Sequence, residues 1–67
     1  MTLKEIRGLK VGDAFCSKNN PNDPFPWKVT VPWDGMDLKA SSCGVEPGYD
    51  GEVFDRRQLT SIYMVQK

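Results

Sequence analysis

The sequence predicts an all-β fold, a small five-stranded barrel that occupies a single domain over residues 1–67. Apolar and polar side chains alternate with a period of two from Trp27 to Trp33, as expected of a half-buried strand. The dipeptide Asp34-Gly35 follows immediately and is typical of a tight hairpin turn. Six glycines and five prolines divide the remaining apolar residues into short runs, which favours several short strands over long helices.

The N-terminal residues predict one short helical element, then a turn and a strand. Leu3, Ile6 and Leu9 are spaced three apart, which indicates a single helical or 3₁₀ turn that packs over one end of the barrel. Residues 9–13 carry glycine and aspartate at their tip, a composition typical of turns. The first strand is expected at Ala14–Ser17.

A long loop and a hairpin are expected in the middle of the chain. Residues 18–26 contain three prolines, which a central strand does not accommodate, so they are predicted to form the longest loop. The strand 27–33 contains Pro32, which indicates that the strand ends, bulges or lies on a sheet edge there. The return strand is predicted over 36–43. Its expected inward-facing side chains are Met36, Leu38 and Ala40.

The C-terminal part of the chain predicts a loop, a strand, a turn and a closing strand. The loop covers residues 44–51 and leads to a fourth strand at Glu52–Asp55. Residues 56–59 are expected to form one tight turn, because they are too few for a helix that is stable alone. β-branched and aromatic residues then predict the last strand over 60–65. The side chains expected to fill the core are Trp27, Val29, Leu38, Phe54 and Ile62.

Two segments resemble known small barrels. Residues 9–13, Leu-Lys-Val-Gly-Asp, resemble the opening turn of many SH3-like and Tudor-like domains. Residues 54–59, followed by 62–65, are similar to the 3₁₀ turn and final strand of the SH3 barrel. The resemblance implies an SH3-like barrel with a short 3₁₀ turn before its last strand, and the alternative is a minimal OB-fold. The chain lacks the acidic loop and paired tyrosines with which SH3 domains bind proline-rich ligands, so that activity is not implied.

Charge and hydropathy narrow the class of protein. Nine basic and nine acidic residues give zero formal net charge, which counts against nucleic acid as the main partner. The N-terminal residues lack the apolar run of a signal peptide, and no stretch has the length of a membrane span. A cytoplasmic location is therefore expected, with Cys16 and Cys43 as buried thiols. The size and texture of the chain resemble those of small bacteriophage and mobile-element proteins.

Catalysis, metals and cofactors are not expected. The chain has no histidine, so nucleophiles activated by histidine are excluded. No glycine-rich phosphate loop is present, and the two cysteines do not have the spacing of a metal site. The acidic residues of the turns do not follow the order of an EF-hand loop, and turn formation explains Asp34 and Asp50 without a metal. The sequence therefore predicts a protein that is not an enzyme.

Surplus aromatic residues and one basic pair are the candidate binding residues. A barrel of this size has room for few of the seven aromatic side chains, so some are expected at the surface, although core packing remains the alternative for each. Arg56 and Arg57 could hold a phosphate or a partner's carboxylate. The alternative is a solvated turn in which an arginine pairs with Asp55 or Glu52. The candidate binding residues are Phe25, Trp33, Tyr49, Arg56, Arg57 and Tyr63.

Three functions are compatible with these residues. The first hypothesis is a non-catalytic interaction module that binds a protein partner or self-associates, for example an accessory phage or mobile-element protein that modulates a host protein. The second is an oligomer that binds or sequesters a nucleotide-like small molecule, with aromatic stacking and an arginine on the phosphate. The third is a weak binder of single-stranded nucleic acid that uses Trp33 and Tyr49 for stacking.

Overall fold

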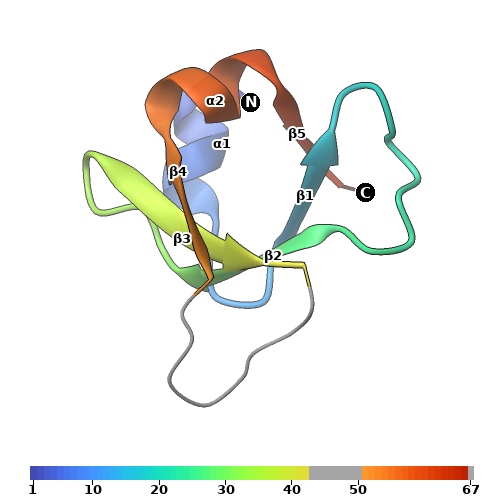
Figure 1. Cartoon of the computed structure of the whole chain (residues 1–67). Coiled ribbons are helices and arrows are strands. Elements are labelled where there is room, and N and C mark those ends of the chain that lie inside the picture. Colours follow the sequence, from blue (N-terminus) through green and yellow to red (C-terminus); the bar gives the residue numbers. More distant parts are fainter. Residues whose placement is uncertain (43–50, 67) are drawn as a thin grey trace.

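The computed structural model describes residues 1–42 and 51–66, which form a curled half-barrel of five antiparallel strands and two short helices (Figure 1). The strand order in the sheet is β4-β3-β2-β1-β5, so the expected all-β class is confirmed. In chain order the elements are α1 (Leu3–Gly8), β1 (Ala14–Ser17), β2 (Trp27–Val31), β3 (Asp37–Ser41), β4 (Glu52–Asp55), α2 (Arg56–Ser61) and β5 (Tyr63–Val65).

β1 to β4 form an antiparallel meander, and the last strand, β5, pairs with the outer edge of β1. β1 pairs with β2 through Phe15 and Trp27, and on its other side it pairs with β5 through Phe15 and Val65. β3 pairs with β4 through Leu38 and Phe54. α2 connects the two outer strands, β4 and β5, and it packs beside α1 at one end of the half-barrel (Figure 1).

The second strand ends one residue before a proline. β2 stops at Val31, because Pro32 has no N–H group to donate to a neighbouring strand. The register of the β2–β3 pair shifts between Val29 and Val31, which marks a bulge or irregularity there. Of the three expected alternatives at Pro32, the strand ends there, so the predicted extent of the strand to Trp33 is wrong and Trp33 lies beyond it.

The turn between β2 and β3 is longer than the expected two residues. Asp34 Oδ1 accepts the backbone N–H groups of Met36 and Asp37 at 2.9 and 3.0 Å, and Gly35 has φ of 106°. These bonds include Met36 in the turn, so the return strand begins at Asp37. Met36 is 79% exposed, and the expectation that it faces inward is wrong. Leu38, 1% exposed, is buried as expected, and so is Ala40.

A capping box forms the helix before the last strand. The Asp55 carboxylate accepts the Gln58 N–H at 2.8 Å, and the Gln58 side chain accepts the Asp55 N–H at 3.1 Å. These bonds start an α-helix of six residues where a 3₁₀ turn was expected, so the predicted start of the last strand at residue 60 is wrong. The helix buries Leu59 and leaves Ile62 48% exposed, so the expectation that Ile62 belongs to the core is also wrong.

The N-terminal helix is built in the same way. Thr2 caps α1, and its hydroxyl accepts the Glu5 N–H at 3.2 Å while Glu5 Oε1 accepts the Thr2 N–H at 2.9 Å. The helix that this second capping box starts places Ile6 in the core, where it is fully buried. Leu9, just after the helix, is also buried. The expected helical turn at Leu3, Ile6 and Leu9 is therefore present.

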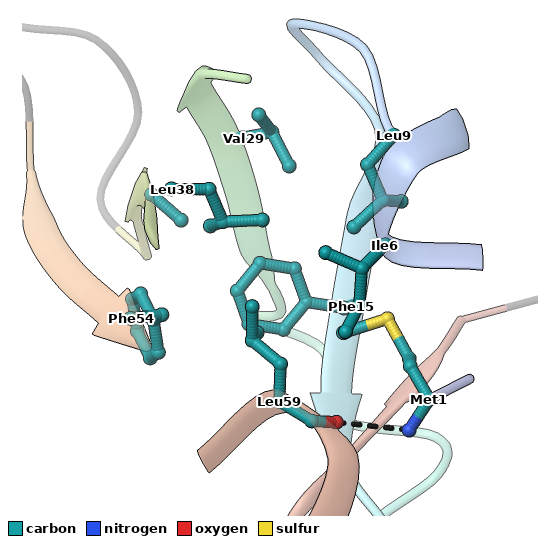
Figure 2. Packing of buried hydrophobic residues seen from close by; sticks show 9 residues of the cluster. Met1, Ile6, Leu9, Phe15, Val29, Leu38, Phe54 and Leu59 are labelled. Carbon is teal, nitrogen blue, oxygen red and sulfur yellow. Dashed lines mark hydrogen bonds between the residues drawn. The ribbon is translucent and has the colours of Figure 1, made fainter. Parts of the chain in front are cut away.

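The core is centred on Phe15 and receives buried side chains from both helices and from β1 to β4 (Figure 2), and half-buried residues of β5 pack against it. Phe15 packs edge-on against Phe54 and Tyr63, with ring centroids 5.2 and 5.3 Å apart, and Trp27 packs against Phe54 at 4.9 Å. Phe54, Leu38 and Val29 are buried as expected, and Trp27 is half-buried against them. The buried cluster is Met1, Ile6, Leu9, Phe15, Val29, Leu38, Ala40, Phe54 and Leu59.

Candidate functional site

The loop 18–26 presents an exposed aromatic side chain on a backbone held by hydrogen bonds. Phe25 is 74% exposed. Pro24 and Pro26 on either side of it restrict its backbone. Its N–H donates to Asp23 Oδ1 at 2.9 Å, and the Asp23 N–H donates to the Asn20 carbonyl oxygen at 3.2 Å. The exposure of Phe25 therefore does not come from a loose loop conformation.

Further hydrogen bonds fasten the same loop to the sheet. The Gln66 side-chain amide, just after β5, donates to the Asp23 carbonyl oxygen at 3.0 Å. The Lys18 N–H donates to the Ile62 carbonyl oxygen at 2.9 Å, and the Cys16 thiol lies 3.6 Å from the Pro21 carbonyl oxygen. The loop is thus tied to β1 and to both ends of β5.

The Cys16 thiol lies underneath this loop. It is 1% exposed, and burial raises its pKa above the usual value, with a further contribution from the charge of Asp23. The thiol is therefore kept protonated and shielded, consistent with the expected role of a small buried hydrophobe. Cys43 lies outside the described residues.

Two of the other candidate aromatic residues belong largely to the core. Trp33 and Tyr63 are half-buried and pack against the buried cluster, and the Tyr63 ring lies 5.4 Å from that of Phe54. The core alternative therefore describes Trp33 and Tyr63 better than a free surface position does. Tyr49 lies outside the described residues.

The basic pair lies on the first turn of α2. Arg56 and Arg57 are both exposed, and within residues 1–42 and 51–66 neither forms an ion pair. The Asp55 carboxylate, one expected partner, instead accepts the Gln58 N–H of the capping box. Within the described residues, the positions of the two arginines are therefore set by α2.

The candidate residues do not converge on one patch within the described part of the chain. Phe25 precedes β2 and Trp33 follows it, so the two lie beyond opposite ends of one extended strand. In Figure 1 the loop 18–26 extends to one side of the molecule, and α2 lies across the end of the sheet, away from the tip of that loop. Phe25 is the only described aromatic candidate that is strongly exposed.

A cleft that the sequence did not predict lies beside β5, at the start of α1 and the end of α2. Its volume is about 500 Å³, and we name it the Lys18 cleft. No local motif could have indicated it, because its residues come from distant parts of the sequence. The residues that line it are Met1, Thr2, Glu5, Lys18, Thr60, Met64 and Val65.

Two amino groups in this cleft donate hydrogen bonds to carbonyl oxygens at the C-terminal end of α2. The Met1 amine donates to the carbonyl oxygens of Leu59 and Tyr63, each at 2.8 Å, and the first of these bonds is drawn in Figure 2. Lys18 Nζ donates to the Thr60 carbonyl oxygen at 3.2 Å. The last carbonyl groups of a helix lack partners within it, so positive groups placed there are favourable.

Burial lowers the pKa of the Met1 amine below its usual value. The nearby charge of Lys18 lowers this pKa further, and the Glu5 carboxylate partly opposes the effect. The amine thus carries a charge that is partly withdrawn from water. It can donate to both carbonyl oxygens whether or not it is charged.

Within the described ranges, histidine, cysteine and carboxylate side chains form no group of three that could hold a metal ion. None of the described helices is long and apolar enough to cross a membrane.

No protein-family model matches the chain, and neither the curated proteins nor the solved structures include a significant match to it.

Proposed function

We propose that the chain is a non-catalytic interaction module that binds a protein partner through the loop 18–26, with Phe25 as its central contact. The observation that carries the proposal is the 74% exposure of Phe25 on a backbone that hydrogen bonds hold in place. A large aromatic side chain exposed to water is unfavourable unless a partner covers it, and aromatic residues dominate the binding energy of protein interfaces.

The fixed backbone of the loop supports binding in a second way. An interface gains affinity when its contact residues are already ordered, because less conformational entropy is then lost on association. Asp23 receives a hydrogen bond from the side chain of Gln66 and accepts the Phe25 N–H, so the position of Phe25 is set before a partner arrives. The zero net charge supports contact by apolar burial over long-range electrostatic attraction.

The finer properties of the module are part of the same proposal. The curled five-stranded sheet supports an SH3-like barrel, and we propose that the protein acts in the cytoplasm as a phage or mobile-element accessory factor. A protein partner is proposed ahead of self-association. The nucleotide-like and single-stranded nucleic-acid alternatives receive less support, because the arginines of α2 lie apart from the exposed aromatic residue among the described residues.

The test places a photo-crosslinking amino acid at position 25 of the full 67-residue chain in its native host. The matched control carries the same amino acid at Met36, which is equally exposed but lies in the turn between β2 and β3. We expect one discrete protein to be crosslinked from position 25 and not from position 36. That protein is then purified, and its affinity is measured for the wild type and for Phe25→Ala and Met36→Ala.

Phe25→Ala is expected to weaken binding of the purified partner by about tenfold or more, because a central aromatic contact is typically worth over 1 kcal/mol. Met36→Ala should leave the affinity unchanged, and both variants should retain the thermal stability of the wild type, because both side chains are exposed. Equal affinities of the wild type and Phe25→Ala would refute the proposal. Crosslinking of a second copy alone would replace it by self-association, and a crosslinked nucleic acid would replace it by the third alternative.

A further inference from the structure

We propose that the Lys18 cleft binds a small organic monoanion, a carboxylate with a short aliphatic chain, whose charged end contacts Lys18 and the Met1 amine. This site is separate from the surface around Phe25, which does not line the cleft. The proposal therefore does not depend on the proposed protein partner, and each can fail without the other.

The cleft has hydrogen-bond donors to spare at its charged end. An ammonium group carries three N–H donors. The Met1 amine donates to two carbonyl oxygens, which leaves one donor, and Lys18 Nζ donates to the Thr60 carbonyl oxygen, which leaves two. A carboxylate has two oxygens that accept such bonds, so it could contact both amino groups at once.

The charges of the cleft favour a single negative charge. Met1 and Lys18 contribute two positive groups, and Glu5 contributes one carboxylate whose Oε1 accepts the Thr2 N–H. One positive charge is therefore in excess when the amine is protonated. No arginine lines the cleft, so the forked guanidinium contact that suits phosphate groups is absent from its described lining. A monocarboxylate matches this set better than a phosphate does.

The remaining lining supplies apolar contact. Met64 and Val65 on β5 are half-buried and line the cleft. Val65 packs against the buried cluster, and because successive side chains of a strand point to opposite faces, Met64 is the residue expected to offer aliphatic surface beside the charged groups. The volume of about 500 Å³ lies within the range of about 300–1,000 Å³ that small-molecule sites have. A chain of a few methylene groups would remove part of this apolar surface from water.

The repulsion between the two amino groups is a second reason for an anion. The charge of Lys18 lowers the pKa of the Met1 amine, so the two positive groups destabilise one another. An anion between them would offset that repulsion. Binding would therefore favour the charged form of the amine.

The experiment is an NMR titration of the ¹⁵N-labelled 67-residue chain with acetate, butyrate, hexanoate and inorganic phosphate at constant ionic strength. We expect the amide signals of the cleft residues to shift, and affinity to increase by up to about fourfold for each added methylene group. Phosphate should bind more weakly than hexanoate. Absence of shifts at cleft residues with millimolar hexanoate, or equal affinities for phosphate and hexanoate, would overturn the proposal.

Three variants separate the charged contact from the apolar one. Lys18→Gln is expected to weaken hexanoate binding by about tenfold, because it removes a charge-assisted hydrogen bond. Lys10→Gln, which changes an exposed lysine outside the cleft, should bind hexanoate like the wild type. Met64→Gln keeps the side-chain length but should flatten the dependence on chain length.

The proposal can still be tested if Lys18→Gln does not fold. Lys18→Arg retains the positive charge and should retain hexanoate binding even if Lys18→Gln is unstable. Unchanged affinity in a folded Lys18→Gln, or an unchanged dependence on chain length in Met64→Gln, would each contradict the site as described.

Discussion

At the scale of single residues, short polar side chains start both helices. The side chains of Thr2 and Asp55 each accept the backbone N–H of the third residue of a helix. The side chains of those third residues, Glu5 and Gln58, accept the backbone N–H of the cap residue. Helices of six residues have few internal hydrogen bonds, so isolated helices of this length are not stable in water. The caps therefore contribute a large share of the local stability, and the rest comes from the burial of Ile6 and Leu59.

Asp55→Ala tests this dependence. The substitution removes the acceptor of the Gln58 N–H and is expected to lower the free energy of unfolding by about 1 kcal/mol. In a domain of this size that corresponds to a fall in the melting temperature of about 4–8 °C. Asp55→Asn keeps an oxygen acceptor and serves as the matched control, with little expected change. Thermal unfolding followed by circular dichroism measures both, and equal melting temperatures for the alanine and asparagine variants would contradict the role of the cap.

At the scale of elements, the start of β4 depends on a glycine. Gly51 has φ of 98°, a left-handed conformation that side chains rarely adopt. A Cβ atom at this position would also overlap the Ala40 carbonyl oxygen of β3, because the two backbones approach closely where the strands begin to pair. The β3–β4 pair thus requires a residue without a side chain at position 51.

Gly51→Ala is expected to destabilise the protein by more than about 2 kcal/mol, since backbone strain and steric overlap act together. Gly12→Ala is the matched control: its φ is 94° but nothing lies within 4 Å of the added Cβ, so the cost should be smaller. Gly8→Ala, at the end of α1 in open space, should stabilise by about 0.5–1 kcal/mol. Urea unfolding gives all three free energies, and a Gly51→Ala no less stable than Gly12→Ala would contradict the close approach.

The elements also show how far local sequence patterns could predict this fold. β1 and β4 have the expected bounds, because predicted turns and loops flank both strands. Met36 and Ile62 were misplaced, because the side-chain bonds of Asp34 and Asp55 lengthen the turn and the helix next to them. The pair Asp55 and Gln58 is a capping-box signal, and the expectation of a tight turn at residues 56–59 did not take it into account.

The candidate site was less predictable than the fold. The surplus of aromatic residues predicted that some of them lie at the surface, but nothing local distinguished the exposed Phe25 from Trp33 and Tyr63, which pack on the core. The Lys18 cleft joins residues that only the tertiary structure brings together. Short-range patterns carry no information about such contacts, so these residues became visible only in three dimensions.

At the scale of the whole molecule, the Met1 amine joins the two ends of the described chain. Its bonds to Leu59 and Tyr63 hold the N-terminal segment against α2 and β5, and the Met1 side chain is part of the buried cluster. Lys18 brings the loop 18–26 to the same helix end. The half-barrel is therefore completed by groups from the beginning, the middle and the end of the described residues.

This arrangement predicts a dependence of stability on pH. The folded pKa of the Met1 amine lies below its ordinary value of 8.0, so the unfolded chain binds more protons between these two values. The free energy of unfolding should therefore rise as the pH increases through this interval and level off above it. The chain has no histidine, so few other groups titrate between about pH 6 and 8.5.

Urea unfolding at several pH values measures this effect. A chain acetylated at its N-terminus cannot titrate there and should give a flat profile, although it is less stable throughout because a single amide N–H cannot donate to both carbonyl oxygens. Lys18→Gln should reduce the slope, since the charge of Lys18 is one cause of the lowered pKa. A flat profile for the unmodified chain would show that its amine is not withdrawn from water as the structure indicates.

The contact between Met1 and residues 59–63 has a consequence for how the protein is made. The ribosome adds Met1 58 residues before Leu59 and 62 residues before Tyr63, whose carbonyl oxygens its amine contacts. Until those residues have left the exit tunnel, Met1 and Ile6 have neither α2 nor β5 to pack against, and Phe15 lacks two of its aromatic neighbours. This part of the nascent chain should consequently stay open and accessible to chaperones and proteases until residues 59–63 have emerged, and then close in one step.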